Sequence, residues 1–196
     1  MVKDRETKVL LLEVAEKHFS ECGYSAVSLK DIASEIGIAK STLFHHFSSK
    51  QDLYLAVVEQ IFQDLKELLR DKNMFSESYN RESFNHFFRN FLQWLDENSN
   101  RTKIIIRLQL ENSEHSKKLS KRFWVPMLKY LDAIRIQLNP SRSKDARVAI
   151  LGVLNSMIHF VFSLDSHLFL FQDKSREDLL LAYENHVLLN VQHILL

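Results

Sequence analysis

The sequence predicts an all-α protein, and three observations support that fold class. Only three glycines and two prolines occur among 196 residues, which suits long helices and disfavours a turn-rich β architecture. Apolar residues recur at helical spacing in one segment after another. With 45% hydrophobic residues, the chain can also bury a substantial core. We expect about nine helices, three of them in an N-terminal unit at residues 1–50 and the others in a larger unit at residues 51–196.

The N-terminal unit has the pattern of a helix-turn-helix. Its first helix is amphipathic, with an apolar face formed by Leu11, Ala15 and Phe19. A second helix follows Ser28, whose hydroxyl can cap a free backbone N–H group, with Asp31 as the expected donor. Gly37 ends this helix, because glycine tolerates the left-handed backbone of a sharp turn. The third helix has a narrow inward face, formed by Leu43 and Phe47.

The outward face of the third helix predicts contact with DNA. It consists of polar side chains that can donate to base edges and phosphates, namely Lys40, Ser41, Thr42, His45 and His46. Residues 39–50 contain two lysines, two histidines and no acid, whereas residues 1–50 together carry seven Lys/Arg and seven Asp/Glu. Positive charge is therefore concentrated at this helix. The alternative is an ordinary solvated helix face, and the pattern is moderately weak in isolation.

The larger unit consists of further predicted helices. A fourth helix continues from Leu53 to Leu69 and links the two units. Proline at 126 predicts a kink or a break in the seventh helix. Ser175 and Asp178 form a capping pair before the last helix. The remaining helices are expected at residues 84–95, 102–110, 116–138, 144–171 and 177–195.

From about Val9 to Leu53 the chain resembles the DNA-binding domain of the TetR family of bacterial transcriptional regulators. The matching pattern covers about a quarter of the chain and combines the amphipathic first helix with Gly23-Tyr24, Ser28, Ile32-Ala33, Gly37-Ile38, Lys40 to Phe44, His46-Phe47, Lys50 and Leu53. The resemblance implies base contacts at Lys40 and Ser41. It implies contacts to phosphates or bases at Thr42, His45 and His46, and to phosphates at Ser28 and Lys50.

Two residues depart from the family pattern. Ala39 stands where a capping side chain is frequent, so the recognition helix begins less firmly, by roughly 1 kcal/mol at most. Phe44 stands where tyrosine is usual and lacks its hydroxyl, so we expect Phe44 to pack rather than to contact DNA.

The last two predicted helices carry more apolar surface than one helix face leaves exposed. The resemblance implies that they pair with a second subunit in a four-helix bundle, which agrees with the need for two recognition helices to read a quasi-palindromic operator. The alternative is that they complete the core of a monomer. The expected interface comprises Leu151, Leu154, Ile158, Phe162, Leu180, Tyr183, Val187, Asn190, Val191 and Ile194.

The middle helices are rich in aromatic residues, which the resemblance associates with a pocket for a small effector. A bulky apolar or aromatic effector is expected, and the pocket set comprises Phe88, Phe91, Trp94, Trp124, Met127 and Phe160. Any single one of these side chains is also explained as ordinary core. Arg107, Arg135 and His159 are candidate polar anchors, although a surface or core role explains each of them better.

Enzymatic function finds no support in the sequence. We find no glycine-rich phosphate loop, HExxH, CxxC or GxSxG motif, and we expect no catalytic residues, no cofactor and no metal. The single cysteine, Cys22, and the lack of a membrane-length apolar run predict a cytoplasmic protein. A repressor released by an effector is the leading hypothesis. The alternatives are the same fold controlled by a protein partner, and a helical enzyme or interaction domain with an incidental helix-turn-helix.

Overall fold

A computed structural model describes residues 2–68, 81–111, 114–138 and 146–195. These residues form ten helices and no strand, so the predicted all-α class is confirmed. The helices are α1 (Val2–Ala26), α2 (Leu29–Glu35), α3 (Lys40–His46), α4 (Lys50–Leu68), α5 (Arg81–Glu97), α6 (Ser99–Glu111), α7 (Glu114–Leu138), α8 (Ala146–Phe162), α9 (Leu164–Leu170) and α10 (Arg176–Leu195).

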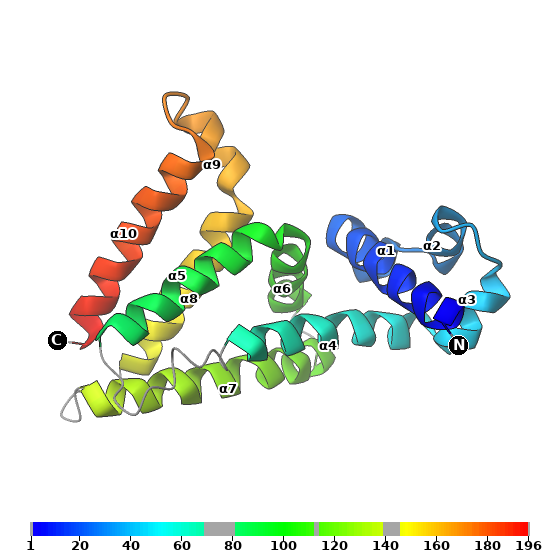
Figure 1. The fold of residues 1–196 in the computed structure, drawn as a ribbon, viewed down its shortest axis with the longest axis horizontal. Coiled ribbons are helices and arrows are strands. Elements are labelled where there is room, and N and C mark those ends of the chain that lie inside the picture. The colour runs from blue at the N-terminus through cyan, green and yellow to red at the C-terminus, as the bar shows by residue number, and fades with distance from the viewer. Residues whose placement is uncertain (1, 69–80, 112–113, 139–145, 196) are drawn as a thin grey trace.

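The helices gather in two groups that α4 and α6 join. Figure 1 shows α1, α2 and α3 at one end of the molecule, with α4 running from them to the group formed by α5, α7, α8 and α10. Helix α6 packs against α1 on one side and against α7 and α8 on the other. The buried residues form one continuous cluster through both groups. The N-terminal unit is therefore packed against the larger unit through α4 and α6.

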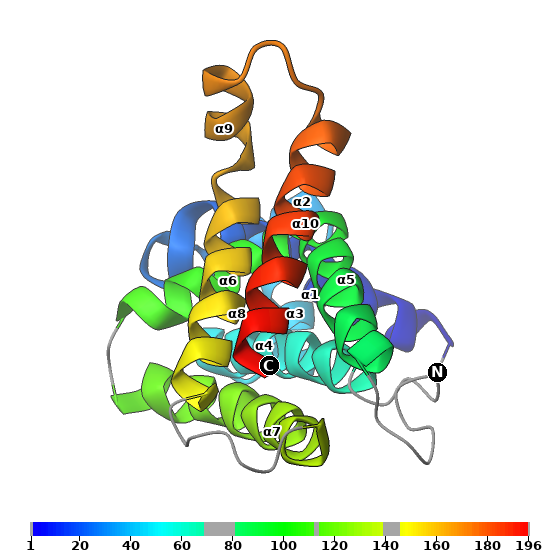
Figure 2. The same cartoon turned by 90° about the vertical axis from the view of Figure 1, so that its left-hand side faces the viewer.

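The predicted eighth helix is divided in two, which gives ten helices instead of nine. Helices α8 and α9 meet at Ser163 with an angle of 68° between them. The Ser163 hydroxyl donates to the carbonyl oxygen of His159 over 2.6 Å, and a serine that bonds back to the preceding turn bends a helix. As a result α9 and the start of α10 project from the body, as Figure 2 shows.

Two other predictions concern a break within α7 and the cap at the start of α10. Helix α7 continues through Pro126, so the predicted break does not occur. The capping pair before α10 is confirmed, because the Ser175 N–H donates to the Asp178 carboxylate over 3.0 Å and the Asp178 N–H donates to the Ser175 hydroxyl over 3.1 Å. In the described part of the chain, no single helix is long and apolar enough to cross a membrane, and only the bent α8–α9 pair meets that criterion when taken together.

Candidate nucleic-acid interface and regulatory surfaces

Helices α2 and α3 form the predicted helix-turn-helix. The Ser28 hydroxyl caps α2 by accepting from the Lys30 N–H over 3.2 Å. Asp31, the donor expected from the spacing, bonds the Ser28 carbonyl oxygen instead. Gly37 has a φ of +71°, and the following Ile38 N–H donates to the Ala33 carbonyl over 3.0 Å. This arrangement closes the end of α2 and turns the chain sharply into α3.

Helix α3 is held by its buried side and lacks a side-chain cap. Leu43 and Phe47 are buried on the inward side, as predicted. Ala39 caps the helix only with its carbonyl oxygen, which accepts from the Thr42 N–H over 2.9 Å. The start of α3 is therefore fixed by packing, and its first N–H groups are left for an outside acceptor such as a phosphate.

The outward side of α3 presents hydrogen-bond donors. Lys40, Ser41 and His45 are exposed, and Thr42 is half-buried. Within the described residues, no hydrogen bond engages the side chains of Lys40, Ser41 or Thr42. These groups can therefore bond base edges and phosphates without first breaking an internal hydrogen bond.

Two residues predicted to contact DNA, His46 and Lys50, instead contact other residues of the protein. The His46 side chain is only 6% exposed and its Nε2 lies 3.6 Å from the Asp4 carboxylate of α1, so the predicted outward position of His46 is wrong. The Lys50 ammonium donates to the Ser25 carbonyl over 3.1 Å and lies 4.7 Å from the centre of the Tyr24 ring. Lys50 can reach a phosphate only if it leaves or shares these contacts.

Phe44 is exposed, contrary to the expectation that it packs. Its ring is 42% exposed on the outward side of α3, and the Lys40 ammonium lies 5.5 Å from the ring centre. Lysine four residues before an aromatic ring lies on the same helix face, where the cation is attracted to the ring. Phe44 therefore shares the outward side of α3 with Lys40 and lies close to the Lys40 ammonium.

Polar contacts between Lys17, His18 and Glu35 join α1 to α2. Glu35 of α2 accepts from the Lys17 ammonium over 2.9 Å and contacts the His18 imidazole over 2.7 Å. These contacts, the Lys17 bond foremost, hold the pKa of the Glu35 carboxyl below its ordinary value. The contacts orient α2 on α1 at the surface of the domain.

The side chains expected to line an effector pocket belong to the buried core cluster or pack against it. Phe88, Phe91 and Met127 are fully buried, Trp94 is nearly so, and Trp124 is half-buried. Phe160 stacks instead on Tyr183, with ring centres 3.7 Å apart, and also contacts His167 of α9. Of the candidate polar anchors, Arg107 faces α1, His159 is exposed, and the Arg135 side chain is outside the described residues.

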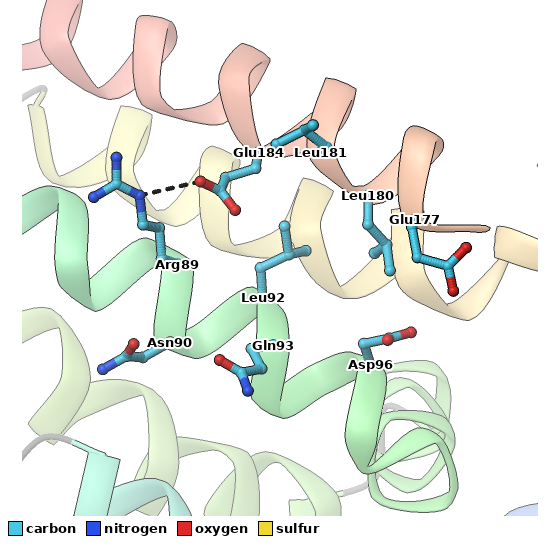
Figure 3. A pocket seen from close by; sticks show the side chains of 9 residues that line it. All are labelled: Arg89, Asn90, Leu92, Gln93, Asp96, Glu177, Leu180, Leu181 and Glu184. Carbon is cyan, nitrogen blue, oxygen red and sulfur yellow. Dashed lines mark hydrogen bonds and ion pairs between the residues drawn. The ribbon is translucent and has the colours of Figure 1, made fainter. Parts of the chain in front are cut away.

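A groove of about 470 Å³ runs between α5 and α10 (Figure 3). Leucines form its apolar part, and polar side chains line its edges. The Arg89 guanidinium bridges the two helices, because it donates to Glu184 over 3.1 Å and also bonds Glu82. Sequence reasoning missed this groove. The lining residues are Arg89, Asn90, Leu92, Gln93, Asp96, Glu177, Leu180, Leu181 and Glu184.

The apolar stripe assigned to a subunit interface faces mostly inward. Leu154, Ile158, Val187 and Val191 are buried within one protomer, so they cannot be the main contacts with a second copy. Leu151, Leu180 and Tyr183 are half-buried, Asn190 and Phe162 are exposed, and the Ile194 side chain lies outside the described residues. Other apolar side chains on α8 and α10 are exposed instead, namely Val148 (72%), Leu181 (58%) and Leu189 (59%).

The sequence of the DNA-binding unit matches known proteins. Residues 11–57 match the family model for bacterial regulatory proteins of the tetR family. The chain is 40% identical over 60 residues to the transcriptional activator FasR of Mycolicibacterium smegmatis, which covers 31% of this chain and 27% of FasR. It is 28% identical over 129 residues to the negative transcriptional regulator IcaR of Staphylococcus epidermidis, which covers 62% of this chain and 67% of IcaR.

Solved structures extend the likeness to nearly the whole chain. A transcriptional regulator from Aquifex aeolicus superposes with a TM-score of 0.72 at 21% identity, covering 96% of this chain and 99% of that one. FadR of Bacillus subtilis, solved with stearoyl-CoA, superposes with a TM-score of 0.67 at 18% identity, covering 93% and 96%. At these identities the superpositions show the fold alone. The match at residues 11–57, together with the helix-turn-helix geometry of α2 and α3, identifies this part of the chain as a DNA-binding domain of the tetR family of bacterial regulatory proteins.

Proposed function

We propose that the protein is a homodimeric repressor that binds a quasi-palindromic operator through α3 and is released by a small apolar effector. The observation that carries the DNA-binding part is the outward side of α3. There Lys40, Ser41 and Thr42 present donors that no described residue occupies, and residues 39–50 contain no acid to repel phosphates. We include Phe44, Ser28 and His45 in the proposed DNA-binding surface, because Phe44 and His45 are exposed beside these donors and Ser28 caps the start of α2.

A homodimer is supported by the exposed apolar side chains of α8 and α10. Val148, Leu181 and Leu189 are each more than half exposed, and apolar surface on two neighbouring helices is typical of a face that another subunit covers. Two recognition helices related by a two-fold axis would read half-sites about one turn of DNA apart, roughly 34–36 Å, or a multiple of that distance.

Repression, and release from the operator by an effector, are supported by fewer observations than DNA binding. IcaR, which is matched over the longer stretch, is a negative regulator, whereas FasR is an activator. FadR has stearoyl-CoA bound, and the core between α5 and α7 contains large apolar side chains such as Phe88, Phe91 and Met127. We therefore infer an effector with a long or bulky apolar part. Control by a protein partner instead of a small molecule is the second candidate, favoured by the open groove between α5 and α10.

The DNA-binding part is tested by selecting genomic fragments with the purified protein. We expect a recurring inverted repeat, bound by two copies of the chain and weakened by rising salt, because each neutralised phosphate releases counterion. Fragments without a common sequence would contradict the proposal.

The effector part is tested with stearoyl-CoA as probe and free CoA as its matched control. Stearoyl-CoA is expected to raise the melting temperature of the protein and to weaken operator binding, since a ligand can shift an equilibrium only through unequal affinity for the two states. If neither compound changes melting or DNA binding, this effector class is wrong and the α5–α10 groove becomes the surface to examine for a partner.

A further inference from the structure

Helix α6 holds the end of α1 through a single arginine. The Arg107 side chain donates from Nε to the Ser20 carbonyl over 3.1 Å and from Nη2 to the Glu21 carbonyl over 2.8 Å. These carbonyls lie in the last turn before the kink at Gly23, where helix carbonyls lack partners within the helix. A guanidinium there satisfies two acceptors at once and places positive charge at the negative end of the helix dipole.

The same guanidinium lies close to Gly23. This residue has a φ of +78°, and a β-carbon there would stand 2.9 Å from the Arg107 Nη1 atom. Glycine at this position therefore serves both the backbone turn and the close approach of the arginine.

A second arginine on α6 holds α1 one turn earlier. Arg101 bonds the Glu16 carboxylate over 3.0 Å and also bonds Asp64 of α4. The Arg101 and Glu16 side chains are 16% and 17% exposed, and burial raises the pKa of the Glu16 carboxyl despite the opposing effect of Arg101. Arg101 therefore joins α1, α4 and α6, and its contact with Glu16 is largely shielded from water.

Two attachment points fix a helix more completely than one. In addition to the packing of α1 against α6, the contacts at Glu16 and at the Ser20 and Glu21 carbonyls restrict both the tilt and the rotation of α1. Helix α1 packs on α2 and α4, and α2 packs on α3. The orientation of α3 therefore follows the orientation of α1.

We propose that Arg101 and Arg107 are positioning residues for DNA recognition, which set the half-site spacing that a dimer accepts without touching DNA. The proposal rests on the proposed function. One added base pair turns a half-site by roughly 34–36° about the duplex axis. Only recognition helices held at a fixed orientation can discriminate against such a change.

The test compares Arg107→Ala with wild type on operators whose half-sites are moved one base pair closer or farther. The control is Lys103→Ala, which removes the same charge from α6 and whose side chain forms no ion pair or hydrogen bond with a described residue. Wild type and the control are expected to lose roughly tenfold or more in affinity on the altered spacings, and Arg107→Ala about threefold or less. Discrimination against a base change within the half-site is expected to stay unchanged in all three proteins.

An Arg107→Ala protein with the spacing profile of wild type would overturn the proposal while leaving the proposed function intact. Wild-type protein that selects no inverted repeat would overturn both. If Arg107→Ala does not fold, as judged by circular dichroism, Arg101→Gln gives the same test, since it removes the bonds to Glu16 and Asp64 and leaves the α1 carbonyls capped. A spacing profile identical to wild type in that variant also contradicts the proposal.

Discussion

Gly23 and Arg107 approach each other so closely that no other residue fits at position 23 without moving the arginine. A β-carbon at position 23 would stand 2.9 Å from the Arg107 Nη1 atom. A β-carbon at Gly37 would have no atom within 4 Å. Both glycines have positive φ angles, +78° and +71°. The collision with Arg107 is therefore specific to position 23.

Gly23→Ala is expected to lower the free energy of unfolding more than Gly37→Ala. Gly37→Ala costs about 1–2 kcal/mol because of the positive φ. Gly23 has φ +78° and ψ +164°, a conformation that only glycine adopts readily, and Gly23→Ala also displaces the Arg107 guanidinium. In an Arg107→Ala background the difference between the two glycine variants should shrink. Urea unfolding of the single and double variants measures this coupling. An unchanged difference would show that the arginine does not press on Gly23.

The contacts of Glu35 predict a specific dependence of stability on pH. Its folded pKa lies below the ordinary value because of Lys17 and His18, so the folded state binds fewer protons there than the unfolded state. The stabilisation is therefore present above the unfolded pKa and is lost as pH falls through the folded one. Thermal unfolding should show Glu35→Gln less stable than wild type at pH 7, with the difference vanishing in acid. A constant difference across pH would contradict this.

The exposed Phe44 ring is expected to contribute to operator affinity. Phe44→Ala should weaken binding by roughly three- to tenfold while leaving the melting temperature nearly unchanged, because the ring is on the outer surface and orients Lys40. Replacing individual thymines of the operator by uracil removes only the C5 methyl group, which an apolar side chain contacts in the major groove. At least one such replacement should weaken operator binding by wild type and should not further weaken operator binding by Phe44→Ala. Equal losses in both proteins would place Phe44 away from the base edges.

The exposed apolar side chains of α8 and α10 are expected to hold the dimer. Val148→Asp combined with Leu189→Asp should shift the protein from dimer to monomer in gel filtration with light scattering, at unchanged helix content. Leu154→Asp is the matched contrast on α8, since Leu154 is fully buried and a buried carboxylate should unfold the chain. A double variant that stays dimeric would exclude this face as the interface.

The sequence was sufficient for features that depend on neighbouring residues. Ser28, Gly37 and the spacing of Leu43 and Phe47 predict the two helices and the turn between them, and the structure has all of these elements. The capping pair before α10 was likewise readable from residues three positions apart.

Features that depend on partners far away in the sequence could not be predicted from it. His46 is covered by Asp4, about forty positions away along the chain, and Arg107 caps α1 across 86 residues. Helix α8 has apolar side chains on more than one face, so its spacing alone did not show that Leu154 and Ile158 point inward while Val148 is exposed. The bend at Ser163 depends on which acceptor its hydroxyl takes, and the sequence does not specify that choice.

If the outward side of α3 reads DNA, a Lys40→Ala, Thr42→Ala double variant should bind the selected operator more weakly than wild type. Lys129→Ala, an exposed lysine of α7, is the control for the lost charge. Fluorescence anisotropy should show the double variant weakened roughly 10- to 100-fold, with the control close to wild type and all three proteins equally folded. An operator affinity of the double variant equal to that of Lys129→Ala would contradict the account.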